Sequence, residues 1–251
     1  MDASRPVVVT PYYKEDRSFL ERCIDSVRRQ TIRTDHLLVA DGFPQDWIDS
    51  AGVRHLRLDR AHGDYGNTPR GVAGVLAASE GCLAISMIDA DNWIEPNHFE
   101  ECLGAARNLA GRECDFVVAR RNLMRPDGTR INIVEEPGSE HVDTNCMVFL
   151  RGAFHLLASW ALMPKQVSSV GDRIMWSTLK ARGLLGVIAG QPTVNYHCIW
   201  ESVYRAIGES PPVGAKPNID STPVALYLRG LNDRDLEIAS RLAGSELRRP
   251  T

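Results

Sequence analysis

Two aspartates stand one residue apart in the stretch at residues 85–96, ISMIDADNWIEP. Asp89 and Asp91 follow a mostly apolar run that predicts a buried strand. Because side chains two residues apart on an extended chain lie on the same side, both carboxylates could bind one Mg²⁺ or Mn²⁺, with a diphosphate supplying further oxygens. The spacing alone favours a solvated loop in which Asp89 or Asn92 caps the following helix.

Asp41 ends a second predicted strand, at residues 37–40, and is followed by Gly42. The carboxyl ends of neighbouring parallel strands meet at one edge of a sheet, where ligands bind in open α/β folds. We therefore expect Asp41 to lie near Asp89 and Asp91. The dipeptide by itself favours an ordinary turn residue before glycine.

Short apolar strands alternate with helical segments in the first half of the chain, a pattern typical of a parallel, doubly wound sheet. Small apolar residues in the second helix predict close packing on a sheet. The predicted strands are residues 7–10, 37–40, 53–58, 82–88 and 116–119, and the predicted helices are residues 18–27, 68–80 and 95–109.

The second half of the chain is less regular. No internal repeat or clean linker divides it from the first half, which favours one continuous domain. Leucine, isoleucine and arginine alternate at helical spacing over residues 228–250, which suits docking onto the domain better than peripheral contact with an anionic membrane. The predicted elements are strands at 147–150 and 185–188, helices at 153–162 and 172–181, a hairpin arm at 131–134, a loop at 136–139 and one or two helices within 224–247.

The composition is that of a globular protein of 251 residues, with 43% hydrophobic and 24% charged residues. No apolar run reaches the roughly 18 residues that a membrane span needs. The net charge of −3 gives no basic footprint for nucleic acid, so we expect no nucleic-acid partner. Six cysteines without a CxxC pair argue against a zinc ribbon or redox dithiol, and the N-terminus lacks signal-peptide features, which predicts a cytoplasmic protein.

Four segments together resemble the family 2 glycosyltransferases of the GT-A fold. That family typically has Pro-x-Tyr-Asn at the start, Asp-Asp-Gly after the second strand, an Asp-x-Asp, and a Glu-Asp that heads a later helix. The segments, in chain order, are VVVTPYYKEDRSFLERCIDSVRRQT, LLVADG, GNTPRGVAGVLAASEGCLAISMIDADNW and VGDRIMWSTLKARGL.

The resemblance implies an α/β fold of GT-A type, with a Rossmann-like mixed sheet flanked by helices in a single continuous domain. Residues 1–217 would form the catalytic domain, with a nucleotide-sugar-binding half to about residue 121 and an acceptor-binding half and lid from about 122 to 217. Residues 218–251 would form a C-terminal helical extension.

Five residues match the donor-binding positions of the family. Pro11 and Tyr13 would hold the nucleotide base, and Asp41 would accept a hydrogen bond from a uracil-like ring. Arg70 would clamp the diphosphate, and Asp89 would reach the ribose or the metal shell. Taken alone, Tyr13 is as typical of a buried strand end and Arg70 of an exposed first helical turn. The sequence departs from the family where Lys14 replaces Asn, Ala40 replaces Asp and Gly171 replaces Glu.

The resemblance also implies a metal site and a catalytic base. Asp91 would bind Mn²⁺ or Mg²⁺ directly, together with Asp89, and His197 would be a further ligand that favours Mn²⁺. Packing is the alternative for His197. Asp172 would take the proton of the acceptor hydroxyl, although an aspartate there also suits helix capping alone. The segments around Trp200 and at 211–214 suit a lid over the donor.

We therefore expect a metal-dependent, inverting glycosyltransferase that moves a sugar from a UDP- or GDP-type donor to a hydroxyl of a glycan or lipid-linked saccharide. One alternative is a sugar nucleotidyltransferase, but the stretch at 10–19, TPYYKEDRSF, lacks the glycine-rich loop such enzymes use. The other is a non-catalytic nucleotide-sugar-binding protein, motivated by the departures at Lys14, Ala40 and Gly171.

Overall fold

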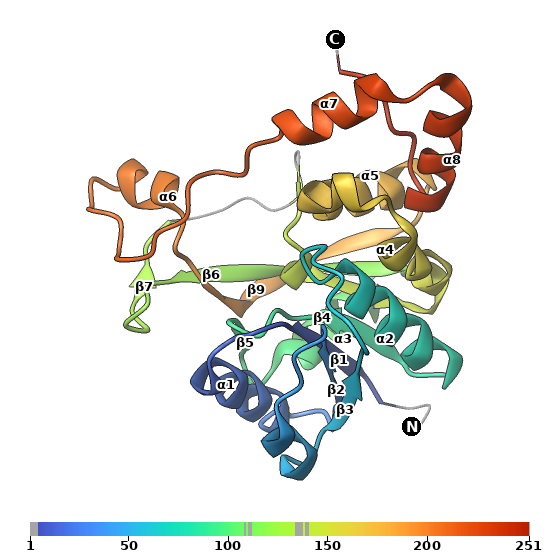
Figure 1. Cartoon of the computed structure of the whole chain (residues 1–251). Coiled ribbons are helices and arrows are strands. Elements are labelled where there is room, and N and C mark those ends of the chain that lie inside the picture. The colour runs from blue at the N-terminus through green and yellow to red at the C-terminus, as the bar shows by residue number, and fades with distance from the viewer. Residues whose placement is uncertain (1–4, 108, 110–111, 134–137, 139–140, 251) are drawn as a thin grey trace.

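The computed structural model describes residues 5–107, 109, 112–133, 138 and 141–250. One mixed sheet of nine strands runs through these residues, with helices on both of its faces (Figure 1). Its order is β3-β2-β1-β4-β8-β6-β9-β5, and β7 pairs with β6. The predicted single α/β domain with a mixed sheet is confirmed.

The first four strands pair in parallel, as predicted for the first half of the chain. The apolar side chains of β1, β2 and β4 are buried because the sheet is covered on both faces, which is why these strands contain continuous apolar runs, whereas the edge strand β3 is only partly buried. These strands are β1 (Val7–Tyr12), β2 (Asp35–Ala40), β3 (Arg54–Arg57) and β4 (Ala84–Met87).

The sheet becomes mixed after β4, because β8 pairs antiparallel with both β4 and β6. The last strand, predicted at 185–188, is longer in the structure than the sequence predicted. It continues to His197 because its second part pairs with β6 beyond an irregularity near Arg120. The remaining strands are β5 (Trp93–Ile94), β6 (Phe116–Met124), β7 (Arg130–Ile131), β8 (Met147–Leu150) and β9 (Gly186–His197). Most of the loop predicted at 136–139, and the end of the hairpin arm, lie outside the described residues.

The helix predicted at 153–162 is divided into a 3-10 helix and a short α-helix. The α-helices are α1 (Arg17–Arg28), α2 (Asn67–Ser79), α3 (His98–Arg107), α4 (Ala158–Leu162), α5 (Gly171–Ala181), α6 (Glu201–Ala206), α7 (Thr222–Gly230) and α8 (Asp233–Ala243). The 3-10 helices are η1 (Asp46–Ser50), η2 (Thr144–Cys146), η3 (Arg151–Leu156) and η4 (Lys165–Val170).

The C-terminal helices α7 and α8 dock onto the domain, as preferred from the sequence. Val224 and Leu228 of α7, and Ala239 and Ala243 of α8, are buried within the main hydrophobic core. Figure 1 shows both helices beside α5, on the same side of the molecule. None of the helices in the described ranges is long and apolar enough to cross a membrane.

Helix α2 packs on β1, β2 and β4 of the sheet, as its small residues predict, and it also packs closely on α4 (Figure 1). A Cβ atom placed on Gly71 would lie 2.5 Å from the Cβ and the backbone nitrogen of Ala161. Glycine is therefore required at this crossing, because a side chain would collide with Ala161.

The α2–α4 contact predicts the effect of adding one methyl group. We expect Gly71→Ala to lower the free energy of unfolding by about 1–3 kcal/mol, because the two helices must separate. The matched control is Gly104→Ala in α3, where nothing lies within 4 Å of an added Cβ. That variant should be neutral or more stable by up to about 1 kcal/mol in urea denaturation. Equal stability of the two variants would contradict the prediction.

Candidate active site

A cavity of about 470 Å³ lies at the carboxyl ends of β1, β2 and β4. It brings together six residues that the sequence singled out: Pro11, Tyr13, Asp41, Arg70, Asp89 and Asp91. The other lining residues are Tyr12, Glu15, Gly63, Tyr65, Gly66, Ala90 and Lys216. A parallel sheet collects side chains from distant parts of the sequence at this edge.

The outer part of the cavity carries an aromatic cluster. Tyr13 is 40% exposed, so it is not a buried strand-end tyrosine. Its ring meets the edge of Phe43 with a centroid distance of 4.7 Å. The ammonium of Lys14 lies 4.1 Å from the centroid of Phe43, so the lysine that replaces the family's asparagine takes part in a cation–π contact. A flat base could stack on this cluster.

Asp41 is buried and holds the loop that follows β3. One carboxylate oxygen accepts a hydrogen bond from the backbone nitrogen of His62 at 2.9 Å and contacts the ring of His62. The other oxygen accepts from the backbone of Gly63 at 3.2 Å. Asp41 is therefore more than the turn residue that the dipeptide favoured, since it positions one wall of the cavity.

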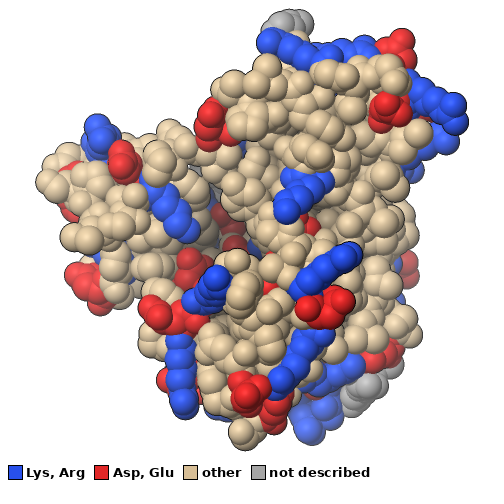
Figure 2. Space-filling view, in the orientation of Figure 1, with Lys and Arg blue, Asp and Glu red and all other residues tan. Residues whose placement is uncertain are grey.

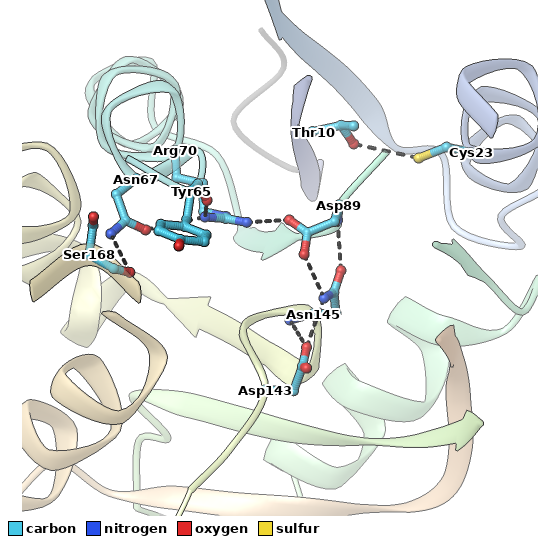
Figure 3. A network of polar contacts seen from close by, with 9 residues as sticks. All are labelled: Thr10, Cys23, Tyr65, Asn67, Arg70, Asp89, Asp143, Asn145 and Ser168. Atoms are coloured by element: carbon cyan, nitrogen blue, oxygen red, sulfur yellow. Dashed lines mark hydrogen bonds and ion pairs between the residues drawn. The ribbon is translucent and has the colours of Figure 1, made fainter. Parts of the chain in front are cut away.

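Asp89 joins Arg70 and Asn145 (Figure 3). Arg70 donates from Nη2 to one oxygen of Asp89, and Asn145 donates to the other at 3.0 Å. Asn145 also accepts from the backbone nitrogen of Asp89 at 2.7 Å. Arg70 is only 5% exposed, so the interpretation as an exposed first-turn arginine is wrong. Both oxygens of Asp89 are engaged with protein.

The network extends on both sides of Asp89, as Figure 3 shows. Asp143 caps η2 and accepts from Asn145 at 2.7 Å, and it pairs with Arg121 at the same distance. Asn67 accepts from Arg70 and donates to the backbone of Ser168, each at 3.3 Å. Asn67 was not predicted as a site residue, because a single amide carries no spacing signal in the sequence.

Asp91 and His197 meet across the sheet edge. Asp89 and Asp91 do not lie on the extended chain that the sequence predicted. Instead, residues 89–92 form a turn, closed by a 3.0 Å hydrogen bond from the backbone nitrogen of Asn92 to the carbonyl of Asp89. Asp91 Oδ2 lies 3.8 Å from Nδ1 of His197, and that nitrogen is buried without a hydrogen-bond partner. The side chain of Asn92 accepts from the backbone of His197 at 2.7 Å and fixes its position.

The predicted set of three metal ligands is only partly assembled. Asp89 is engaged by Arg70 and Asn145, which leaves Asp91 and His197 facing each other. Within the described part of the chain, no group of three or more His, Cys, Asp or Glu side chains is arranged to hold a metal ion. Any cation here would need further ligands from a bound substrate.

Asp172 lies in the first turn of α5 and does not line the cavity. One of its oxygens lies 3.0 Å from Nε2 of His141, and the other accepts from the backbone of Arg173 at 2.7 Å. The hydrogen bond to Asp172 raises the pKa of His141 against an opposing effect of desolvation. His141 was not predicted, because it lies in an irregular segment 31 positions before its partner in the sequence.

The departure at Gly171 has a steric cause. A Cβ atom at this position would lie 2.8 Å from Nδ2 of Asn67. A glutamate at this position, as found in the family, would therefore require the side chain of Asn67 to move, because α5 lies close to the first turn of α2. The same approach brings Asp172 toward the segment that carries Arg70.

Two further lining residues were missed, Lys216 and Glu15. Lys216 stands just beyond the predicted lid at 211–214, and its backbone pairs with Ile199 at 2.7 Å. Burial raises the pKa of Glu15, and the charges of Asp91 and Asp89 add to this effect. The cavity wall thus holds four carboxyl groups against two basic side chains.

The contact of His141 with Asp172 predicts a pH-dependent stability. Because the folded pKa of His141 is raised above its usual value of about 6.5, the pair stabilises the fold fully below that pH and loses its effect as the pH rises through the raised pKa. We expect His141→Gln to lower the Tm more at about pH 5.5 than at about pH 9.

The control is His155→Gln, since the exposed His155 contacts a backbone oxygen and not a carboxylate. Its effect on Tm should be the same at both pH values. A His141→Gln effect that grows toward high pH would contradict the assignment.

Comparisons with known proteins identify the family and the fold of the chain. The model of glycosyl transferase family 2 matches residues 7–155. S. aureus TarS 1–349 in complex with UDP-GlcNAc has a TM-score of 0.57 at 12% identity, over 95% of this chain and 71% of that one. The complex with UDP has a TM-score of 0.56 at 12% identity, with 95% and 70% covered.

The structure of TarS without those residue limits has a TM-score of 0.53 at 11% identity and covers 95% of this chain but 42% of that one. No curated protein sequence matches the chain. The structural likeness confirms the predicted fold of GT-A type. Because the family model spans more than half of its residues, the chain belongs to glycosyl transferase family 2.

Proposed function

We propose that this glycosyltransferase is a metal-dependent, inverting enzyme that moves a sugar from a UDP-sugar to a hydroxyl of a saccharide or lipid-linked saccharide. The observation that carries the proposal is the cavity that gathers Pro11, Tyr13, Asp41, Arg70, Asp89 and Asp91 at one sheet edge. UDP is favoured over GDP because TarS, which has the same fold, is described in complexes with UDP and UDP-GlcNAc.

The aromatic cluster would bind the base and Arg70 the diphosphate. Tyr13 and Phe43 offer exposed ring surface for stacking, and Asp41 fixes the loop at the other side of the base. Arg70 keeps a buried Nε without a hydrogen-bond partner, and a phosphate oxygen would satisfy it. In this assignment Asp89 orients the guanidinium.

The charge balance supports a divalent cation. Four carboxyl groups in the wall would repel a diphosphate, and two basic side chains do not compensate for them. Asp91 and the unpartnered Nδ1 of His197 fit one cation whose other ligands are phosphate oxygens, and the imidazole favours Mn²⁺ over Mg²⁺. When bound, such an ion would neutralise the charge that develops on the leaving diphosphate.

Asp172 would act as the base. The acceptor oxygen forms a bond to the anomeric carbon while the bond from that carbon to the diphosphate breaks on the opposite face, so UDP leaves with the electron pair and the configuration inverts. The hydroxyl proton passes to the Asp172 carboxylate. The hydrogen bond from His141 holds that carboxylate in place.

Metal-dependent binding can be measured by thermal shift with UDP, with and without Mn²⁺. For a ligand present at 100 times its Kd we expect a stabilisation of about 2.7 kcal/mol. Asp91→Asn should lose the part that depends on Mn²⁺. The control Asp25→Asn, an exposed residue of α1 that pairs with Arg28, should keep it. Absence of any Mn²⁺-dependent effect in the unmodified protein would refute the metal proposal.

The assignment of the base predicts a separation of binding from turnover. Asp172→Asn should lower kcat by about 10²–10⁴-fold, because the acceptor proton has no receiver, while the affinity for UDP stays within about twofold. UDP release from UDP-GlcNAc in the presence of saccharide acceptors measures turnover. Loss of UDP binding in this variant would make Asp172 structural, and UDP binding by the unmodified protein without turnover would favour the non-catalytic alternative.

A further inference from the structure

A second cavity, of about 520 Å³, adjoins the donor cavity. Tyr65 and Lys216 line both, so the two spaces are neighbours across a shared wall. One side of the second cavity is η4, and the other is the segment from Lys216 to Asp220. Figure 2 shows a hollow at the centre of this face, between the lobe that carries α6 and the body of the molecule.

Tyr65 stands between the cavities in a strained conformation. Its φ of 59° is the only positive value for a non-glycine residue in the described part of the chain. For a bulky residue this region costs about 1–3 kcal/mol, and such strain is retained chiefly at functional sites. Arg70 holds it by donating to the carbonyl of Tyr65 at 2.7 Å, and the side chain is 69% exposed. The fold thus maintains a solvent-facing ring beside the donor.

The lining of the second cavity is predominantly basic. Lys165 and Lys216 line it, and no carboxylate of the described residues lies within ion-pair distance of either lysine. The only acidic lining residue is Asp220, which accepts a 2.9 Å hydrogen bond from the backbone of Thr222. The ammonium of Lys165 lies 3.4 Å from the position of a Cβ on Gly63, a residue of the donor cavity. Lys165 therefore lies at the junction of the donor cavity and the second cavity.

The second cavity is also connected to the proposed base. The helix η4 continues directly into α5, which begins at Gly171, and Asp172 follows. Asn67 donates to the backbone of Ser168 in η4, which ties this wall to the first turn of α2 (Figure 3). The wall of the second cavity formed by η4 is therefore only two residues from Asp172 along the chain.

We propose that the second cavity binds the acceptor, and that the acceptor is an acidic saccharide whose carboxylate or phosphate pairs with Lys165. This inference rests on the proposed transfer reaction. Tyr65 and Trp200 supply ring surface for the apolar face of a sugar, while the neutral polar residues Gln166 and Ser169 suit its hydroxyls. An uncompensated ammonium at the junction places the anionic group close to the reacting hydroxyl.

The test compares three oligosaccharides that differ only in the terminal residue, which is glucuronate, glucose 6-phosphate or glucose. The unmodified enzyme should use at least one acidic form with a KM about tenfold or more below that of the neutral form. Which acidic form is preferred distinguishes carboxylate from phosphate. Lys165→Gln should abolish the preference, and Lys165→Arg should restore it. The control Lys180→Gln changes an exposed lysine of α5 that lies over Trp176 and should behave as the unmodified enzyme.

Donor hydrolysis and the thermal shift with UDP separate this inference from the proposed function. Both should be unchanged in Lys165→Gln, because Lys165 is assigned to the acceptor. If the unmodified enzyme prefers the neutral form, or if Lys165→Gln raises the KM for the UDP-sugar, the acidic-acceptor proposal is wrong although the transferase function stands. If the protein neither binds UDP nor turns over the donor, both proposals fall.

Discussion

The carboxylate of Asp89 is the junction on which the donor cavity depends. It arrives at the end of β4, whereas Arg70 comes from α2 and Asn145 from η2, so one side chain ties three separate segments together. A buried guanidinium needs a partner because desolvation of an uncompensated charge is costly. The loop with the strained Tyr65 and the first turn of α2 are positioned through the same arginine. The cavity and its neighbour therefore share one electrostatic support.

This arrangement gives the two aspartates of the Asp-x-Asp different contacts and therefore different roles. Each carboxylate oxygen of Asp89 accepts a hydrogen bond from a protein donor, whereas Asp91 Oδ2 lies 3.8 Å from the buried Nδ1 of His197. The division arises from the turn at 89–92, which sends the side chains to different neighbours. It also explains why an acidic wall can surround a proposed diphosphate site, since one carboxylate neutralises Arg70 and another is left for a cation.

The sequence predicted the secondary structure correctly where local patterns of apolar residues determine it. The strands β1, β2, β3 and β4 and the helices α1, α2 and α3 agree with the predicted ranges to within a few residues, whereas β6 runs five residues beyond its predicted end and the short strand β5 was not predicted. The prediction from sequence failed where contacts between distant parts of the chain determine the length of a strand or the burial of a side chain. The strand β9 extends to His197 only through β6, and Arg70 is buried only because Asp89 and Asn67 receive it. His141 has its partner 31 positions away in the sequence, and no local pattern marks it.

By itself the sequence determined the α/β class and the spacing of the strand-end carboxylates, because strand and helix periodicity and the placement of turn residues are local properties. The tertiary structure alone decided which oxygens remain available and which space Gly171 must leave for Asn67. It also decided that a basic second cavity adjoins the acidic donor cavity. The reason is physical: desolvation, steric exclusion and charge balance depend on neighbours in space, and most of these neighbours are far apart along the chain.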